Sequence, residues 1–480
     1  MPRKRPINAD VPGTGAPTAP SKTPADKPKT PAGGSSAGPP SPKQRGNGPI
    51  ALLKKLGTLP PKRQRKPVPL ALKAIGGIVV LAVVFIVVAI VGGSRDESRT
   101  AAPAPVTGST DAPASQASEE LGYPAFATSN TTRVGGADPA FNAAGVALAT
   151  YPSAEPAQRP AAVALVPADE WQAGIAASVL MAAPLGPPNG VQDGLLKRLP
   201  TGAPLLISDA GDIPEPTVHA LDTLDPQGSQ ATEGVQVYAI GDAAVPGELK
   251  AKRVAGHNPA AAAAAIAALR DSLFRAPPAH IVIAPLTEPA FAMPAAAWAA
   301  RSGDPVLFAG RNALPKATRA ALRAHPDAPI YVLGPDSAIS AKAIKEIAEI
   351  GGRVQRVAGE DPVENAIALA RFDSGDFGWN VNDPGHGFVI ARSDSPLDAA
   401  AAAPLSASGT WGPLLLTDSA DTLPPTLRGY LLDVKPGYSN DPTRAFYNHV
   451  WVIGDQEAID VRQQAEIDEL AELAKIGGGA

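Results

Sequence analysis

The sequence contains no cysteine, and only 5% of its 480 residues are aromatic. The lack of cysteine excludes disulfides and cysteine nucleophiles. It does not identify a cellular compartment, because a protein with a large hydrophobic core can be stable without disulfides. The six histidines are scattered without metal-ligand spacing, and HExxH, GxSxG, Walker A and strand-following GxGxxG motifs are all missing. We therefore expect no catalytic residues, no metal site and no cofactor, and a protein that is not an enzyme.

The net charge of −4 conceals two segments of opposite charge. Residues 1–73 hold 15 Lys/Arg against 2 Asp/Glu, whereas residues 100–480 hold 25 against 42. Residues 1–69 are rich in Pro, Lys, Gly, Ser and Thr, a composition that cannot bury enough apolar surface to fold. This segment is predicted to be a disordered basic tail. It has no folded nucleic-acid-binding motif, so we expect no specific nucleic acid, and a cytoplasmic protein partner stays open.

A transmembrane helix is predicted within residues 70–93. Ala74–Gly93 is a run of twenty residues without a charge, and at about 1.5 Å per residue it matches the roughly 30 Å of a bilayer core. Positive charges are concentrated before this run, which predicts a single-pass protein with a cytoplasmic N-terminus. Residues 94–132, rich in Ala, Pro, Ser and Thr, are predicted to be an extracytoplasmic linker.

A short motif, which we call the repeat motif, occurs three times after this linker: Arg133–Pro139, Arg253–Pro259 and Arg356–Pro362. The shared pattern is Arg-Val-x-Gly-x-Asp/Asn-Pro. Asp or Asn suits a helix N-cap and proline suits the first helical position, so each repeat motif predicts a strand end, a glycine turn and a helix start. Three copies with matching residues downstream indicate an internal repeat.

Similar elements follow each repeat motif in the same order. They are an apolar strand, an Ala-rich helix, a Pro-led apolar run, a helix after a proline-bearing turn, and a closing strand that ends at glycine. The first strands are Val163–Val166, Ile281–Ala284 and Phe388–Ala391, and the closing strands are Val237–Gly241, Tyr331–Gly334 and Val450–Gly454. This alternation predicts small α/β repeats with parallel strands buried on both faces. The repeats are placed at 133–252, 253–355 and 356–456, and residues 457–480 are predicted to form a C-terminal helix, around Glu457–Ile476, and a tail.

The repeat motifs, the Pro-led runs and the closing strands resemble the bacterial cell-wall-binding repeat 2 family of Gram-positive surface proteins. The resemblance implies an α/β fold of three tandem repeats in a pseudo-threefold arrangement, and non-covalent binding of an envelope polymer. It also implies that the Leu-Leu positions of the Pro-led runs bind the polymer, although the residues alone are equally consistent with a buried strand. These positions are Leu205, Leu206, Val306, Leu307, Leu414 and Leu415.

Two further sets of residues are candidates for binding. Asp209 and Asp418 directly follow the Pro-led runs, at the strand ends where open α/β sheets place functional groups. The third repeat also contains two long loops with aromatic residues, predicted at the opposite edge of its sheet. Trp379, Tyr438 and Tyr447 in these loops form an alternative sugar-binding surface, unless the aromatic rings anchor the loops to the scaffold.

The sequence thus favours a membrane-anchored extracytoplasmic protein that binds a cell-wall or envelope polymer. Two other classes of function stay open. One is an envelope sensor or receptor for a small solute, and the other is a structural adaptor for another envelope protein.

Overall fold

The computed structural model describes residues 126–186, 201–407 and 412–476. All of them lie in the second of the two units into which the chain divides, Met1–Ala104 and Pro105–Ala480. The predicted basic tail, the predicted membrane span and most of the predicted linker lie outside the described residues. Among the residues that are described, no helix has both the length and the hydropathy needed to cross a bilayer.

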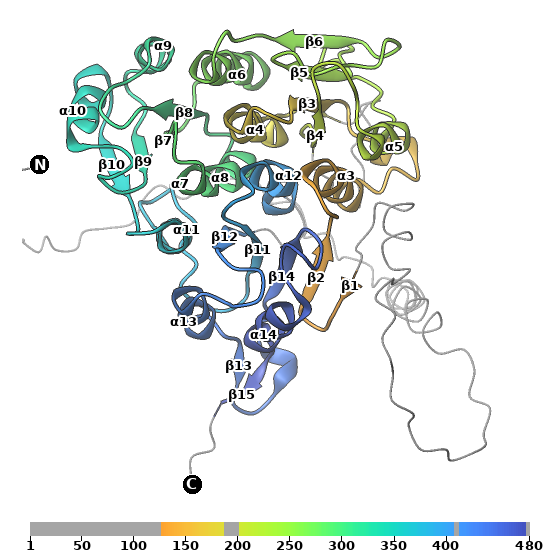
Figure 1. Ribbon diagram of the computed structural model, residues 1–480, viewed down its shortest axis with the longest axis vertical. Coiled ribbons are helices and arrows are strands. Elements are labelled where there is room, and N and C mark those ends of the chain that lie inside the picture. The colour runs from red at the N-terminus through yellow and green to blue at the C-terminus, as the bar shows by residue number, and fades with distance from the viewer. Residues whose placement is uncertain (1–125, 187–200, 408–411, 477–480) are drawn as a thin grey trace, which may run out of the picture. The chain divides into compact units, whose positions relative to one another are not determined.

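The described residues contain three sheets that each include four parallel strands in the same order (Figure 1). We call the strand that runs into each repeat motif the motif strand, and the strand of each Pro-led run the second strand. Across each sheet the order is second strand, first strand, closing strand and motif strand. The first sheet consists of β4 (Leu205–Ser208), β3 (Val163–Pro167), β5 (Val237–Ile240) and β6 (Ala251–Val254). The second consists of β8 (Val306–Ala309), β7 (Ile281–Pro285), β9 (Ile330–Leu333) and β10 (Val354–Val357). The third consists of β12 (Leu414–Thr417), β11 (Gly387–Arg392), β14 (His449–Ile453) and β2 (Thr131–Val134), with β1 (Phe126–Ala127) antiparallel at its edge.

Each motif strand joins the sheet that precedes it in the chain. β6 pairs with β5 and β10 pairs with β9, so these two motif strands complete the first and second sheets. In the part of the chain that the structure describes, no sheet precedes β2, which pairs instead with β14, with Arg133 opposite Val452. The three sheets therefore form a closed cycle. The predicted repeat boundaries at residues 253 and 356 consequently fall within strands of the preceding sheets.

Alanine-rich helices lie between the three sheets (Figure 1). They are α4 (Trp171–Ala177), which continues as a 3₁₀ turn (Ser178–Ala182), then α7 (Pro289–Ala292), α8 (Pro294–Ser302) and α12 (Pro396–Ala407). α12 packs against α4, α8 and the first motif helix, α3 (Pro139–Thr150). Ala399–Ala403 are each at most 1% exposed, and a Cβ atom added to Gly174 would lie 3.1 Å from Cβ of Ala400. The helix backbones therefore approach as closely as methyl side chains allow, which explains the abundance of alanine and the scarcity of aromatic residues.

The remaining helices cover the outer parts of the sheets. The other motif helices are α6 (Pro259–Phe274) and α11 (Pro362–Arg371), and each motif helix is capped by Asp138, Asn258 or Asp361, whose side chain accepts backbone N–H groups. The helices after the second strands are α5 (Glu215–Leu224), α9 (Lys316–Ala324) and α13 (Pro425–Asp433), and those after the closing strands are α10 (Ala341–Ile350) and α14 (Val461–Ala471). Short 3₁₀ turns occur at Pro156–Gln158 and Pro442–Arg444.

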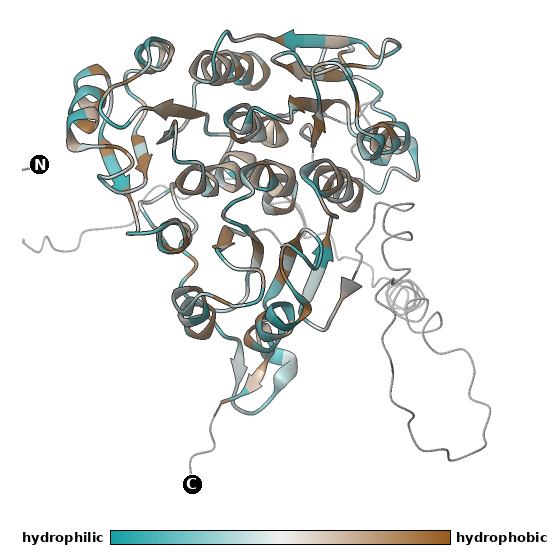
Figure 2. Ribbon diagram, viewed as in Figure 1, coloured by the Kyte–Doolittle hydropathy of each residue, from teal (hydrophilic) through white to brown (hydrophobic). Residues whose placement is uncertain are grey.

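Hydropathy separates the inner strands from the motif strands. The inner strands are mostly hydrophobic in Figure 2, while β6 and β10 carry hydrophilic residues. Three of the four residues of β6 are exposed, as expected for strands at the open edge of a sheet, where polar side chains oppose edge-to-edge association. β2 is fully buried instead, because β1 covers its free edge and α14 packs against it.

The predicted α/β class and the predicted parallel buried strands are confirmed. The C-terminal helix is shorter than predicted, since it begins at Val461, where Asp460 accepts the N–H of Gln463, and it ends at Ala471. The chain after it forms β15 (Ala474–Lys475), which pairs with β13 (Gly437–Tyr438). These two short strands and α10 were not predicted from the sequence.

Candidate functional site

The arginine of the repeat motif connects each motif strand to the turn after the closing strand of the same sheet. In all three sheets its Nη1 donates to the carbonyl oxygen of the glycine that ends the closing strand. The pairs are Arg133 with Gly454 at 2.9 Å, Arg253 with Gly241 at 2.7 Å, and Arg356 with Gly334 at 2.5 Å. These glycines have φ values of 94°, 59° and 97°, which favour glycine. The motif residues therefore hold the carboxyl-end edge of each sheet together.

Arg133 differs from the other two motif arginines in its burial. It is 2% exposed and also donates to the carbonyls of Asp455 and Ile459 and, through Nε and Nη2, to Oε1 of Gln464. Burial lowers the pKa of its guanidinium to about 10, although the nearby carboxylate of Asp455 opposes that shift. Gln464 in turn donates to Oγ1 of Thr131. This buried network attaches β2 to the third sheet.

The Leu-Leu positions predicted to bind a polymer are all buried. They lie in β4, β8 and β12, and none of the six side chains is more than 2% exposed. The residues are Leu205, Leu206, Val306, Leu307, Leu414 and Leu415. They pack in the core between the sheets and the helices, so their side chains present no surface to a polymer. The structure thus agrees with the interpretation of these six residues as parts of buried strands.

Asp209 and Asp418 lie at the carboxyl ends of β4 and β12, and both are exposed. Backbone contacts hold the loop of the first sheet, where the N–H of Asp209 donates to Asp212 and its carbonyl accepts from Ala244. Gly310 occupies the equivalent place in the second sheet. Both exposed aspartates are therefore accessible, and each adds a negative charge to the end of its strand.

The alternative aromatic surface is only partly exposed. Trp379 is 9% exposed and packs edge-on against Trp298 at 5.6 Å, so its assignment to a sugar-binding surface is corrected: this ring anchors its loop to the scaffold. Tyr438 is half-buried in β13. Tyr447 is 57% exposed, and its neighbour Phe446 is 70% exposed. The exposed part of the surface is therefore Phe446 and Tyr447.

The two loops of the third repeat meet at the amino-end edge of the third sheet, as predicted. Asn448 is buried there, and its Oδ1 accepts the backbone N–H groups of Gly385 and His386 at 2.8 and 3.2 Å. Its Nδ2 donates to the carbonyl of Val434 at 2.8 Å. The side chain of Asn448 thus joins both loops beneath the exposed ring of Phe446, whose Cβ lies close to Gly385.

A basic face on the second sheet was not anticipated from the sequence. Residues 253–355 hold 11 Lys/Arg and 7 Asp/Glu, whereas residues 133–252 and 356–456 each hold 6 and 13. The exposed basic residues of α9 and α10, which pack side by side, define this face: Lys316, Arg323, Lys342 and Lys345. Arg319 pairs with Glu346 between the two helices, which leaves Glu349 as the exposed carboxylate on them. The face therefore carries a net positive charge, although residues 100–480 as a whole are acidic.

A buried carboxylate connects α12 with α3. Asp398 of α12 is 3% exposed, and its Oδ1 accepts from Nδ2 of Asn142 of α3 at 2.7 Å. Burial raises the pKa of Asp398, and the hydrogen bond from Asn142 only partly opposes this shift. Asp398 lies in the first turn of α12, and its hydrogen bond with Asn142 joins this helix to α3.

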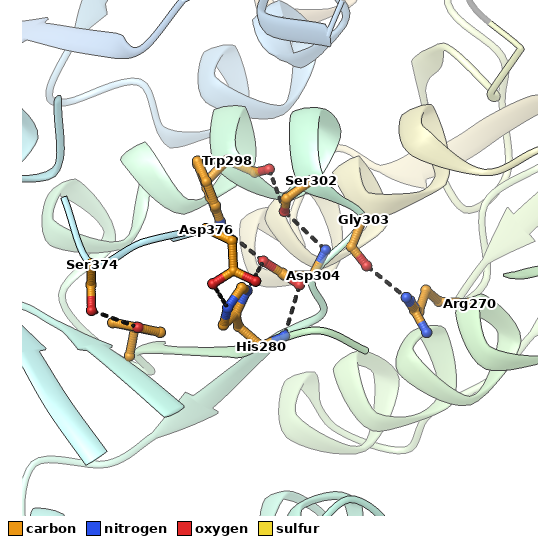
Figure 3. A network of polar contacts seen from close by, with 9 residues as sticks. Arg270, His280, Trp298, Ser302, Gly303, Asp304, Ser374 and Asp376 are labelled. Atoms are coloured by element: carbon orange, nitrogen blue, oxygen red, sulfur yellow. Dashed lines mark hydrogen bonds and ion pairs between the residues drawn. The ribbon is translucent and has the colours of Figure 1, made fainter. Parts of the chain in front are cut away.

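His280, directly before β7, lies at the centre of a polar network (Figure 3). Its Nδ1 lies 3.1 Å from Oδ2 of Asp304, and its Nε2 lies 3.1 Å from Oδ1 of Asp376. Asp304 also accepts from Nε1 of Trp298 at 2.9 Å. Both ring nitrogens therefore face carboxylates, and in the described residues no hydroxyl group is hydrogen-bonded to His280. The arrangement is a bridge between carboxylates and does not resemble a nucleophile–base pair.

In the described ranges, no three or more His, Asp or Glu side chains are grouped so that they could hold a metal ion. Among curated proteins no match to this chain was found. The family model of cell wall binding domain 2 (CWB2) matches residues 253–344 and 356–462, and the first predicted repeat lies outside these matches.

Two cell wall proteins of Clostridium difficile have similar solved structures. Cwp6 has a TM-score of 0.53 at 18% sequence identity, and the match covers 71% of this chain and 47% of Cwp6. Cwp8 has a TM-score of 0.51 at 18% identity, covering 72% of this chain and 52% of Cwp8. The chain thus spans about half the length of each protein, and the likeness concerns the fold. Residues 253–344 and 356–462 are thus similar to the cell wall binding domain 2 family, over two consecutive segments of this chain.

Proposed function

We propose that this protein is a non-catalytic, membrane-anchored protein that binds a cell-wall polymer through three tandem α/β repeats. The observation that carries the binding is the match of the CWB2 family over residues 253–344 and 356–462. The common strand order of the three sheets and the common arginine contact with the closing glycine support a third repeat at 133–252, and with it the pseudo-threefold arrangement.

The proposed membrane anchor rests on the sequence before the linker. Ala74–Gly93 has the length and composition of one span. The basic residues before it favour a cytoplasmic N-terminus and place the repeats outside the membrane. The charged tail of residues 1–69 then lies in the cytoplasm, where it is available to an unidentified protein partner.

The basic face of α9 and α10 is the surface that best suits an anionic polymer. The predicted leucine positions are buried, and the exposed strand-end residues Asp209 and Asp418 are acidic. An anionic chain gains attraction at Lys316, Arg323, Lys342 and Lys345 and is repelled by acidic edges. Phe446 and Tyr447 offer a separate exposed pair of rings against which the C–H face of a sugar can pack.

Sedimentation of the full-length protein with purified, protein-free cell walls tests the function and separates these surfaces. Changing Lys316, Arg323, Lys342 and Lys345 together to Glu should reduce the bound fraction severalfold, and added salt should weaken wild-type binding. A matched control changes Glu215 and Asp222, exposed on α5, to Lys.

The control should bind at least as well as the wild type. Loss of binding in a Phe446→Ala, Tyr447→Ala variant alone would move the site to the aromatic pair. Binding of the wild type only to walls that retain their proteins would replace polymer binding by an adaptor function. No binding to either preparation would refute wall binding.

A further inference from the structure

The loop between α11 and β11 docks on the second sheet, although it leads into the third. Its tip is a tight turn in which the N–H of Ser374 donates to the carbonyl of Phe377 at 2.9 Å. Phe377 is 1% exposed, and its ring stacks on Tyr331 of β9 with centroids 3.5 Å apart and an interplanar angle of 1°. The hydroxyl of Tyr331 donates to Oγ of Ser374 at 3.1 Å. The tip thus connects two repeats.

Asp376 lies at this tip and contacts His280 of the second repeat. Figure 3 shows the imidazole between Asp304 on one side and Asp376 on the other, each 3.1 Å from a ring nitrogen. The two carboxylates differ in their surroundings. The side chain of Asp304 is 1% exposed and is also held by the indole N–H of Trp298 and the backbone N–H of His280. The side chain of Asp376 is 84% exposed.

The number of protons on the imidazole determines how many carboxylates it can hold. A neutral imidazole has one N–H group, whereas the protonated ring has two. With one N–H, one nitrogen must turn its lone pair toward a carboxylate oxygen, which is unfavourable. Asp304 is fixed by its other hydrogen bonds, so the contact that is given up is the one with the exposed Asp376.

We propose that His280 is a proton-dependent latch, which in its protonated form holds the tip of the 372–381 loop against the second sheet and on deprotonation releases Asp376. The charged groups that face His280 are Asp304, from the segment between α8 and β8, and Asp376, from the loop. β9 contributes the Tyr331 ring at 5.6 Å, and the loop contributes the Phe377 ring at 5.5 Å. The ion pairs of these two carboxylates with His280 are the contacts that the latch uses.

The electrostatics of the docked state agree with this geometry. Burial lowers the pKa of His280, but the hydrogen bonds and charges of Asp304 and Asp376 outweigh it and hold the pKa above the ordinary value of 6.5. The docked loop therefore binds the proton more tightly than the released loop. Docking is therefore favoured while His280 is protonated, and it weakens as the pH rises through the raised pKa of the docked state.

Hydrogen–deuterium exchange of the full-length protein tests the latch. The backbone N–H groups of Asn380 and Val381, which donate to Phe372 and Ala370, report on the attachment of the loop. After correction for the intrinsic pH dependence of exchange, we expect their protection to fall severalfold between pH 6 and pH 8, as the imidazole loses its second N–H group. The loop at 434–448 should show no such change.

An Asp376→Asn variant removes the exposed charge of the latch, and Asp376 is at the surface, so folding is preserved. Its loop protection should vary less than twofold over the same pH range. Asp373→Asn is the matched control, because Asp373 lies in the same loop and accepts from Gly375 without contacting His280. This control should keep the wild-type pH dependence. The latch is refuted if wild-type protection is independent of pH, or if the two variants behave alike.

Discussion

The three motif arginines allow one prediction to be worked out within a single molecule, because the same motif residue occurs in three environments. Arg133 is 2% exposed and donates hydrogen bonds to four acceptor atoms. They are the carbonyl oxygens of Gly454, Asp455 and Ile459, and Oε1 of Gln464. Replacing it with Met keeps most of the aliphatic volume but leaves these acceptors without donors in the core. A buried acceptor that is left without its donor costs about 1–3 kcal/mol, and Arg133→Met leaves several such acceptors together.

Arg253 supplies the comparison. It is exposed and donates to only two carbonyls, those of Gly241 and Ala243. Water replaces those hydrogen bonds when the side chain is removed, so Arg253→Met should cost about 0.5–1.5 kcal/mol. Arg356 is half-buried, and burial lowers its pKa, so its Met variant should fall between the other two.

The measurement is urea unfolding of the full-length protein and of the three Met variants, followed by tryptophan fluorescence. The expected order of destabilisation is Arg133, then Arg356, then Arg253. The closed cycle of sheets also predicts one main transition for the wild type, because β2 and the central helices connect the first and third repeats. Equal losses for Arg133→Met and Arg253→Met would refute the argument from burial.

Four further predictions concern charge, packing and topology. Asp398→Asn should stabilise the protein at pH 7 relative to the wild type, and the difference should shrink toward pH 4, since the buried carboxyl has a raised pKa and its ionised form is costly. Asp394→Asn should have the opposite sign in the same denaturation assay, because the hydrogen bond from Arg392 lowers the pKa of Asp394 and that stability is lost as the pH falls through the lowered pKa. Gly412→Ala should abolish folding as judged by circular dichroism, because its Cβ would lie 1.7 Å from the carbonyl oxygen of Gly387. Protease added to intact protoplasts should digest residues 100–480 and leave the tail protected, and the reverse pattern would contradict the proposed orientation.

Local features of the fold were predictable from the sequence because they depend on local chemistry. Asp138, Asn258 and Asp361 are N-caps with proline next to them, as their residue types indicate. The glycines at the ends of the closing strands were evident from the repeat. The partner of each motif strand was not predictable, because a strand–turn–helix motif carries no information on which sheet receives its strand.

The candidate site was less predictable than the fold. The leucine positions lie in strands covered on both faces, and an apolar run has the same composition whether it binds a ligand or packs in a core. Trp379 is buried because its ring packs against that of Trp298 in the second repeat. The composition of the loop alone could not predict this contact. His280 stands alone in the sequence, and its two carboxylates come from Asp304 and Asp376, which are distant along the chain.

The repeated and the unrepeated residues have different roles in this structure. What recurs three times is structural: the capped motif helix, the motif arginine and the closing glycine all act at contacts between a strand and its own sheet. The exposed features differ between the sheets, with acidic strand ends on the first and third, a basic face on the second and aromatic rings on the third. A polymer that bound equally to all three repeats would need equivalent exposed groups, and none of these features provides them. We therefore expect the repetition to maintain the closed arrangement of sheets and the unrepeated surfaces to determine what the protein binds.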